Sequence, residues 1–292
     1  MDWVSLSLLC ALALASADAA TKAWLGALST AELALVRLTL SGVLLAPLLA
    51  DLPPLATLAP AFWGWLAALV PLEIAAMLLY MRAIRDHPLS LTLPYLAFTP
   101  VFVLLVAWLL LDETVSARGA FGVVLVVAGA WLLNVGHARA RDWRSWLRPL
   151  GAILEQRGAR LMLAVAAIYA LTATLGKGAM QYLPPAQFGA FYFALLGVVA
   201  LLVLALPRPR RLLALARHPW AVLAVAALSA VMVYTHFLAI AATEVAYMIA
   251  LKRTSLLFGM LYGALCFGER GLRARLPAGV LMLAGAALVL QG

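Results

Sequence analysis

Charged residues are scarce in this chain of 292 residues. Asp, Glu, Lys and Arg together make up 11% of it, whereas soluble domains carry about 25%. Hydrophobic residues reach 66%, and the mean hydropathy is +1.04. Apolar runs recur throughout, each near the ~20 residues that a helix needs to cross a bilayer. The sequence therefore predicts an all-α polytopic membrane protein, with the lipid bilayer as its surroundings.

Cysteines and catalytic motifs are also few. Cys10 and Cys266 lie inside apolar runs and are interpreted as small buried hydrophobic residues. The sequence lacks a zinc-protease H-E-x-x-H and a G-x-S-x-G nucleophile elbow. Gly176-Lys177 lacks the other residues of a phosphate-binding loop. These absences argue against a membrane-embedded enzyme, and we expect no cofactor and no metal.

The formal net charge of +9 has a simpler explanation than nucleic-acid binding, because the basic residues cluster in short segments between apolar runs. Loops after odd-numbered spans hold most of the arginines, whereas loops after even-numbered spans hold mainly acidic residues (Asp51, Asp112, Glu113 and Glu244). The positive-inside rule then places the odd-numbered loops in the cytoplasm and both termini outside. The N-terminal stretch 6–19 resembles a secretory signal, but it follows Asp2 without any Lys or Arg, so we expect it to be retained as the first span.

An internal duplication organises the chain. Glu113 corresponds to Glu269, 156 residues later, and the Gly of Ala-Gly-Ala at 129 corresponds to that at 285 with the same offset. Further pairs at 155 or 156 residues are Lys22/Lys177, Gly42/Gly197, Tyr80/His236 and Thr99/Ser255. Such self-similarity indicates two copies of one structural unit.

The apolar runs divide into about ten helices, five in each copy. The expected helices are 3–26, 30–50, 61–85, 89–111, 117–136, 159–182, 184–206, 219–242, 244–267 and 273–291. The first repeat spans residues 1–136, a linker spans 137–158, and the second repeat spans 159–292. The linker mixes Arg with Trp143 and Trp146, which suits an amphipathic helix lying in the membrane interface. Because five is odd, the second repeat enters the membrane from the opposite side, and such inverted repeats are typical of secondary transporters.

These residues resemble the drug/metabolite transporter superfamily, in particular its ten-helix EamA-type members. The resemblance covers essentially the whole chain, and no single motif is specific. The segments that carry it are Lys22, 36–38, 83–84, 99–102 and 112–114 in the first half, and Lys177, 239–240, 253–255, 268–269 and 284–285 in the second. Two departures are Tyr192, where the first half has Arg37, and Leu256, where it has Pro100.

The resemblance implies a transporter in the bacterial inner (plasma) membrane, and length and style are similar to those of the YddG-type amino-acid exporters. Together with the repeat, it predicts alternating-access export or exchange of small amphipathic metabolites, most of all amino acids, aromatic ones included. We expect a monomer that acts on a small-molecule substrate. Members of the superfamily often place their termini inside, but the charges favour termini outside. A channel, a membrane scaffold or a sensor is the alternative.

Charged residues inside spans usually mark function. Asp18 lies four residues before Lys22, so both share one helical face and form either a local ion pair or a coupling site for a proton. Glu73 fits an internal pair or a ligand contact, and Lys252-Arg253 either meets a carboxylate or snorkels. Glu113 and Glu269 are interpreted as caps of the fifth and tenth helices.

Polar aromatic residues inside the spans need hydrogen-bond partners and therefore face inward or toward water. Repeat symmetry brings equivalent positions together, and Pro94 and Pro100 bend the fourth helix into a wall of the pathway. The predicted lining has little fixed charge, which suits a zwitterionic amino acid, and His236 makes transport sensitive to pH. The substrate-binding candidates are Tyr80, Tyr95, Thr99, Tyr169, Tyr234, His236, Tyr247, Lys252 and Ser255.

Overall fold

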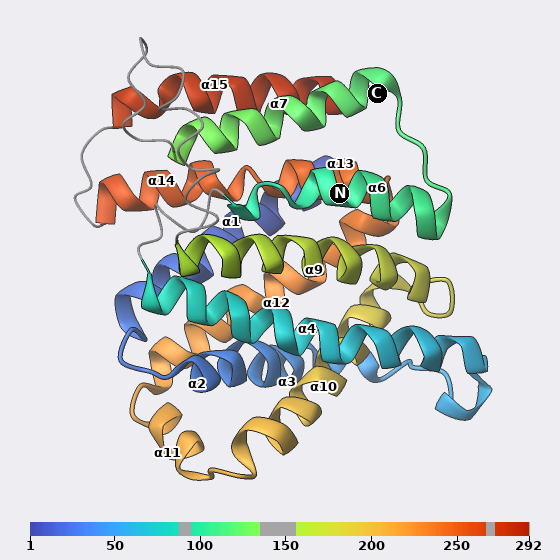
Figure 1. Ribbon diagram of the computed structural model, residues 1–292. Helices are drawn as coiled ribbons and strands as arrows, with labels where there is room; N and C mark the ends of the chain where they lie inside the picture. The colour runs from blue at the N-terminus through green and yellow to red at the C-terminus, as the bar shows by residue number, and fades with distance from the viewer. Residues whose placement is uncertain (88–94, 135–155, 267–271, 292) are drawn as a thin grey trace.

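The computed structural model describes residues 1–87, 95–134, 156–266 and 272–291. In these residues the chain is helical, with no strand (Figure 1). Seven helices are long and apolar enough to cross a membrane, and three shorter apolar helices accompany them. The prediction of an all-α membrane protein is confirmed, while the predicted linker, 137–158, lies outside the described residues as far as 155.

Among its described residues, the first half contains five helical stretches that match the predicted spans, with Pro60–Asp86 one residue longer than predicted at each end, and a short 3-10 segment, Leu55–Thr57, between the second and third. The second stretch is compound, because a π-helical segment (η1) and a 3-10 segment (η2) interrupt it. The elements are α1 (Trp3–Trp24), α2 (Thr30–Leu35), η1 (Val36–Leu40), α3 (Ser41–Leu45), η2 (Ala46–Leu49), η3 (Leu55–Thr57), α4 (Pro60–Asp86), α6 (Thr99–Leu111) and α7 (Ala117–Asn134).

The second half follows the same plan with one addition, a short helix α11 in the loop after its second span. Its ninth span, predicted as one helix, is broken into α13 and α14. The elements are α9 (Arg157–Ala179), α10 (Pro185–Ala200), η4 (Leu201–Ala205), α11 (Arg210–Ala216), α12 (Pro219–Ala241), α13 (Val245–Lys252), α14 (Ser255–Cys266) and α15 (Leu272–Val289).

Local sequence explains where many of these helices begin. Asp2 caps α1 by accepting a hydrogen bond from the Ser5 amide at 2.8 Å. Ser29 and Glu32 form a capping box at the start of α2. A proline stands at the start of α4, α10 and α12, where its missing N–H leaves no hydrogen bond unmade.

The helices pack in pairs that the repeat offset relates. Helices α1 and α4 of the first half correspond to α9 and α12 of the second. Helix α1 packs along α12, and α9 packs along α4 in the same way. Likewise α6 contacts α9, while α14 contacts α1. Counterparts also meet each other: α10 lies against η1 and α3, and α7 lies beside α15 at one side of the bundle (Figure 1).

Glycines permit the closest of these approaches. A Cβ on Gly42 would lie 2.5 Å from the Phe193 carbonyl oxygen, and one on its counterpart Gly197 would lie 3.0 Å from the Thr39 Cα. Between α7 and α15, a Cβ on Gly122 would lie 2.7 Å from the Gly285 carbonyl oxygen, and one on Gly285 would lie 2.6 Å from that of Gly122. Small residues thus let helix backbones touch, as predicted for the Ala-Gly-Ala segments.

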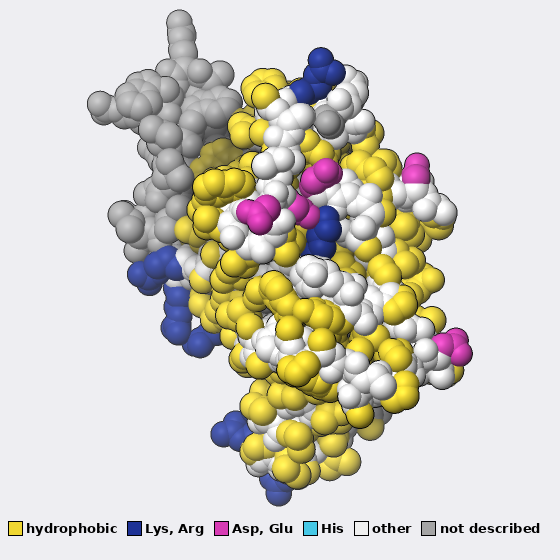
Figure 2. Space-filling model, turned by 90° about the vertical axis from the view of Figure 1, so that its right-hand side faces the viewer, with side chains coloured by type: hydrophobic (Ala, Val, Ile, Leu, Met, Phe, Trp, Pro, Cys, Tyr) yellow, Lys and Arg dark blue, Asp and Glu magenta, His cyan; other side chains and the backbone are white. Residues whose placement is uncertain are grey.

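Both chain termini lie at one end of the bundle, together with the loop between α6 and α7, and α11 lies toward the opposite end (Figure 1). The end with the termini is mostly hydrophobic or uncharged on its surface. Near its middle, acidic side chains gather with a Lys or Arg among them (Figure 2).

Replacing Gly122 by Ala should lower the thermal stability of the protein, because the new Cβ would force α7 away from α15. Overpacking of this kind costs about 1–3 kcal/mol. The measurement is the melting temperature of the purified protein in detergent. Gly64→Ala is the matched control, since a Cβ there meets nothing within 4 Å. Equal melting temperatures for the two variants would contradict the close contact.

Candidate functional site

A cavity of about 110 Å³ lies between the two halves. Elements of both repeats contribute to its wall, which combines aromatic faces, hydroxyl groups and charged groups. Its lining residues are Leu14, Arg37, Glu73, Met77, Tyr80, Leu96, Thr99, Tyr169, Thr172, Ala173, Tyr192, Phe193, Met232, Val233, His236, Phe237, Ile249, Lys252 and Arg253.

Two helix interruptions face this cavity at positions related by the repeat offset. The fourth span turns at 97–98, just before α6, and the ninth turns at 253–254, just before α14. At each turn the tight backbone bonds correspond: Phe98 N–H donates to the Tyr95 carbonyl, and Thr254 N–H donates to the Leu251 carbonyl. Discontinuous helices at such positions commonly build transporter binding sites.

Threonine hydroxyls satisfy carbonyl groups that the turns leave without helical partners. Thr99 donates to the Leu96 carbonyl at 2.7 Å, and Thr254 donates to the Leu251 carbonyl at 2.8 Å. In lipid such internal satisfaction is required, because no water is present to supply it.

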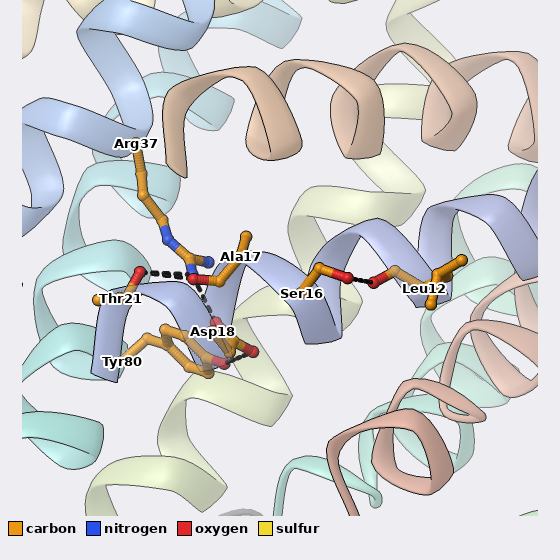
Figure 3. A network of polar contacts seen from close by, with 7 residues as sticks. All are labelled: Leu12, Ser16, Ala17, Asp18, Thr21, Arg37 and Tyr80. Atoms are coloured by element: carbon orange, nitrogen blue, oxygen red, sulfur yellow. Dashed lines mark hydrogen bonds and ion pairs between the residues drawn. The ribbon is translucent and has the colours of Figure 1, made fainter. Parts of the chain in front are cut away.

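An ion pair with a bound tyrosine occupies one side of the site, entirely within the first half (Figure 3). Arg37 Nη2 donates to Asp18 Oδ1 at 2.6 Å and to Thr21 Oγ1 at 3.2 Å, and the Tyr80 hydroxyl donates to Asp18 Oδ2 at 2.8 Å. Arg37 is only 3% exposed and lies in the π-helical segment η1. Asp18 therefore pairs with Arg37, a partner that the sequence did not predict. Lys22 lies in the last turn of α1 and is exposed.

The second half supplies two cations to the same cavity, Lys252 and Arg253. Lys252 Nζ lies 3.6 Å from Met232 Sδ and 3.5 Å from His236 Nδ1. Glu73, from α4, lines the cavity as well. The expectation of a lining with little fixed charge is therefore wrong, because four of its side chains are Glu, Lys or Arg.

Of the predicted binding residues, five line the cavity: Tyr80, Thr99, Tyr169, His236 and Lys252. Four do not. Tyr95 is buried against Trp131, and Tyr234 is 38% exposed on α12. The Tyr247 hydroxyl accepts from the Ser116 amide at 3.1 Å, and Ser255 is buried at the start of α14.

The lining also contains residues that the binding hypothesis left out. Arg37, Glu73 and Arg253 were recognisable as charges inside spans, and Tyr192 as the counterpart of Arg37 in the second half. Thr172 carried no signal apart from its polarity.

Glu113 joins the two halves instead of capping the fifth helix. Its Oε1 forms an ion pair with Lys177 on α9, and its Oε2 accepts from the Val245 amide, the first residue of α13, at 2.9 Å. Lys177 Nζ also donates to the Thr243 carbonyl at 2.6 Å. Ser116 instead caps α7, accepting from the Gly119 amide at 2.9 Å. Glu269, the counterpart of Glu113, lies outside the described residues.

Fold and cavity together define a helical integral membrane protein with a cavity that both similar halves line. A family model described as the EamA-like transporter family matches residues 1–135 and 156–291, and the chain belongs to this family. It is therefore a membrane transporter of small molecules, from a family that is not enzymatic. The predicted resemblance is confirmed.

Solved structures support the fold. One solved structure, described as "Crystal structure of protein", superposes on this chain with a TM-score of 0.70 at 16% sequence identity. The match covers 98% of this chain and 94% of that one. In all, 27 chains of solved structures match. No curated protein matches the chain.

Breaking the Asp18–Arg37 pair from either side should destabilise the protein more than removing both charges. Asp18→Asn or Arg37→Met alone leaves a poorly compensated charge inside the protein, at a cost of about 3–5 kcal/mol, whereas the double variant leaves none. Melting temperatures of the two single variants and the double variant form the cycle. Arg82→Gln is the control, because its pair with Asp86 is exposed and is expected to contribute little. Strictly additive losses would show that the pair is not coupled.

Proposed function

We propose that this protein is a secondary transporter that exports or exchanges small amphipathic metabolites, most of all amino acids, by alternating access. The observation that carries the proposal is the cavity between the halves, whose wall combines aromatic faces with charges of both signs. An aromatic or apolar side chain of a substrate packs against rings such as Tyr169 and Phe237. The ammonium group of a zwitterion is attracted to Glu73, and its carboxylate is attracted to Lys252 and Arg253.

Alternating access follows from two five-helix repeats of opposite orientation. Support comes from the helix pairs and helix interruptions related by the offset of 155 or 156 residues, described above. Two such halves exchange conformations to open the same site to either side of the membrane. The positive-inside rule further favours a cytoplasmic linker and termini outside.

Counterflow in proteoliposomes tests the transport proposal. Vesicles loaded with unlabelled amino acids should accumulate the labelled ones without ATP, because a carrier exchanges substrate and a pore does not. We expect His236→Ala and Tyr169→Ala to reduce exchange at least about tenfold, since both side chains line the cavity.

Tyr234→Ala is the matched control, because Tyr234 lies two residues from His236 on the same helix but is 38% exposed. It should exchange substrate at the wild-type rate. Normal exchange by the cavity variants, or an absolute need for ATP, would refute the proposal.

The Glu113–Lys177 pair is proposed to hold the end of the molecule at the α6–α7 loop closed. Glu113→Gln should therefore shift the protein toward the state open at that end, because it removes the ion pair that ties the α6–α7 loop to α9. The measurement is the rate at which a membrane-impermeant maleimide modifies Thr172→Cys, a cavity residue, in a background without Cys10 and Cys266.

We expect modification from the outer side to rise several-fold. Glu244→Gln is the control: Glu244 accepts a hydrogen bond from the Thr243 hydroxyl at 3.1 Å and makes no ion pair with a described residue. An unchanged rate in Glu113→Gln would rule out the pair as a closure, and faster labelling from the inner side would reverse the assigned orientation.

A further inference from the structure

Two adjacent cations at the break of the ninth span form no ion pair with a carboxylate among the described residues. Lys252 ends α13 and Arg253 forms the turn before α14, and both line the cavity. Arg253 is 4% exposed, and its Nε is buried with no hydrogen-bond partner. Lys252 Nζ lies close to Met232, His236 and Cys10, none of which is a carboxylate.

Such a pair is costly unless something balances it. A buried charge without a partner is strongly unfavourable, and charged residues inside membrane spans face cavities where ligands pass. The rest of the described lining does not provide the balance. Arg37 is matched by Asp18 at 2.6 Å, which leaves Glu73 as one carboxylate facing two cations. The wall is therefore short of one negative charge.

We propose that Lys252 and Arg253 form the subsite for a carboxylate group of the transported metabolite, an inference that rests on the proposed transport function. The planar guanidinium of Arg253 matches a carboxylate with two parallel N–H donors, and Lys252 adds a compact charge beside it. Helix α14 begins at Ser255, immediately after the pair, and the positive end of its dipole adds to the attraction.

Glu73 selects among anions. Its carboxylate on the same wall repels a doubly charged phosphate group, and it attracts an ammonium group. A ligand that carries one carboxylate together with an ammonium group brings an opposite charge to Lys252 with Arg253 and to Glu73, and it leaves the net charge of the wall unchanged. An amine without a carboxylate leaves Lys252 and Arg253 uncompensated.

Ligand binding to the purified full-length chain tests the subsite. The probes are the twenty common amino acids, the carboxamide counterpart of each one that binds, and inorganic phosphate, followed by isothermal titration calorimetry. We expect the wild type to bind at least one amino acid at least about tenfold more tightly than its carboxamide. This comparison needs no mutation and does not depend on how well a variant folds.

Variants then locate the effect. Arg253→Gln should weaken the amino acid at least about tenfold and remove its advantage over the carboxamide, while Arg253→Lys should recover part of both. Arg211→Gln is the control for a lost arginine, because Arg211 lies on α11 and bonds the Leu204 carbonyl outside the cavity. It should bind like the wild type.

Three results would overturn the subsite: equal binding of acid and carboxamide, a preference that survives Arg253→Gln, or tighter binding of phosphate. Failure of every amino acid to bind would overturn it as well. Counterflow with the wild type separates this inference from the transport proposal. Exchange of a solute without a carboxylate would support the transport proposal and contradict the subsite. If no solute is exchanged, both proposals are contradicted.

Discussion

A helix interrupted within a bilayer must satisfy its freed backbone groups from inside the protein, because lipid offers no hydrogen bonds. This constraint acts twice here, at 97–98 and at 253–254. Each interruption is closed by a threonine hydroxyl and by tight turn bonds, and each must face protein or a cavity. The two turns bring Thr99 and the Lys252-Arg253 pair to the cavity wall, so the position of the site follows from the way the backbone is satisfied.

Packing is similar in the two halves, but their chemistry differs. The first half provides Asp18, Arg37 and Glu73, and the positions one offset later hold Ala173, Tyr192 and Ser229. The second half provides Lys252 and Arg253, where the first has Leu96 and Ala97. Related helices thus supply a common frame, while the charges of the site come from different positions in each half. A ligand between them meets unequal walls, which favours one orientation over the other.

Much of this arrangement could be predicted from the sequence, because the repeat offset acts as a contact rule. It identified the Gly129 and Gly285 segments as helix contacts, and it brought Tyr80 and His236 to one cavity. The offset does not predict which way a side chain faces around its helix axis. Tyr234 and His236 are two positions apart on one helix, about 200° around its axis, so they face different ways.

The remaining errors have other physical causes. Tyr247 bonds to the Ser116 amide in the loop before α7, a contact between distant segments that no local pattern reveals. Asp18 has two basic residues within reach of its helix, and only the path of η1 decides that Arg37 is the partner. Glu113 has the spacing of a cap for α7, but in the fold its carboxylate binds the start of α13 and Lys177 instead.

Proline was expected to bend the fourth span, and the second half shows that a break at this place forms without proline. Pro100 stands in the first turn of α6, where its missing N–H removes no helical bond. At the same place the second half has Leu256, and its ninth span is broken all the same. What the two breaks share is the short-range bonding: Val101 N–H donates to the Phe98 carbonyl, and Leu257 N–H donates to the Thr254 carbonyl. Because backbone and hydroxyl groups hold the turn, the side chain at its first position is free to differ, and it is Ala97 in one half and Arg253 in the other. The fold can therefore carry a cation at the break of a span without changing its backbone.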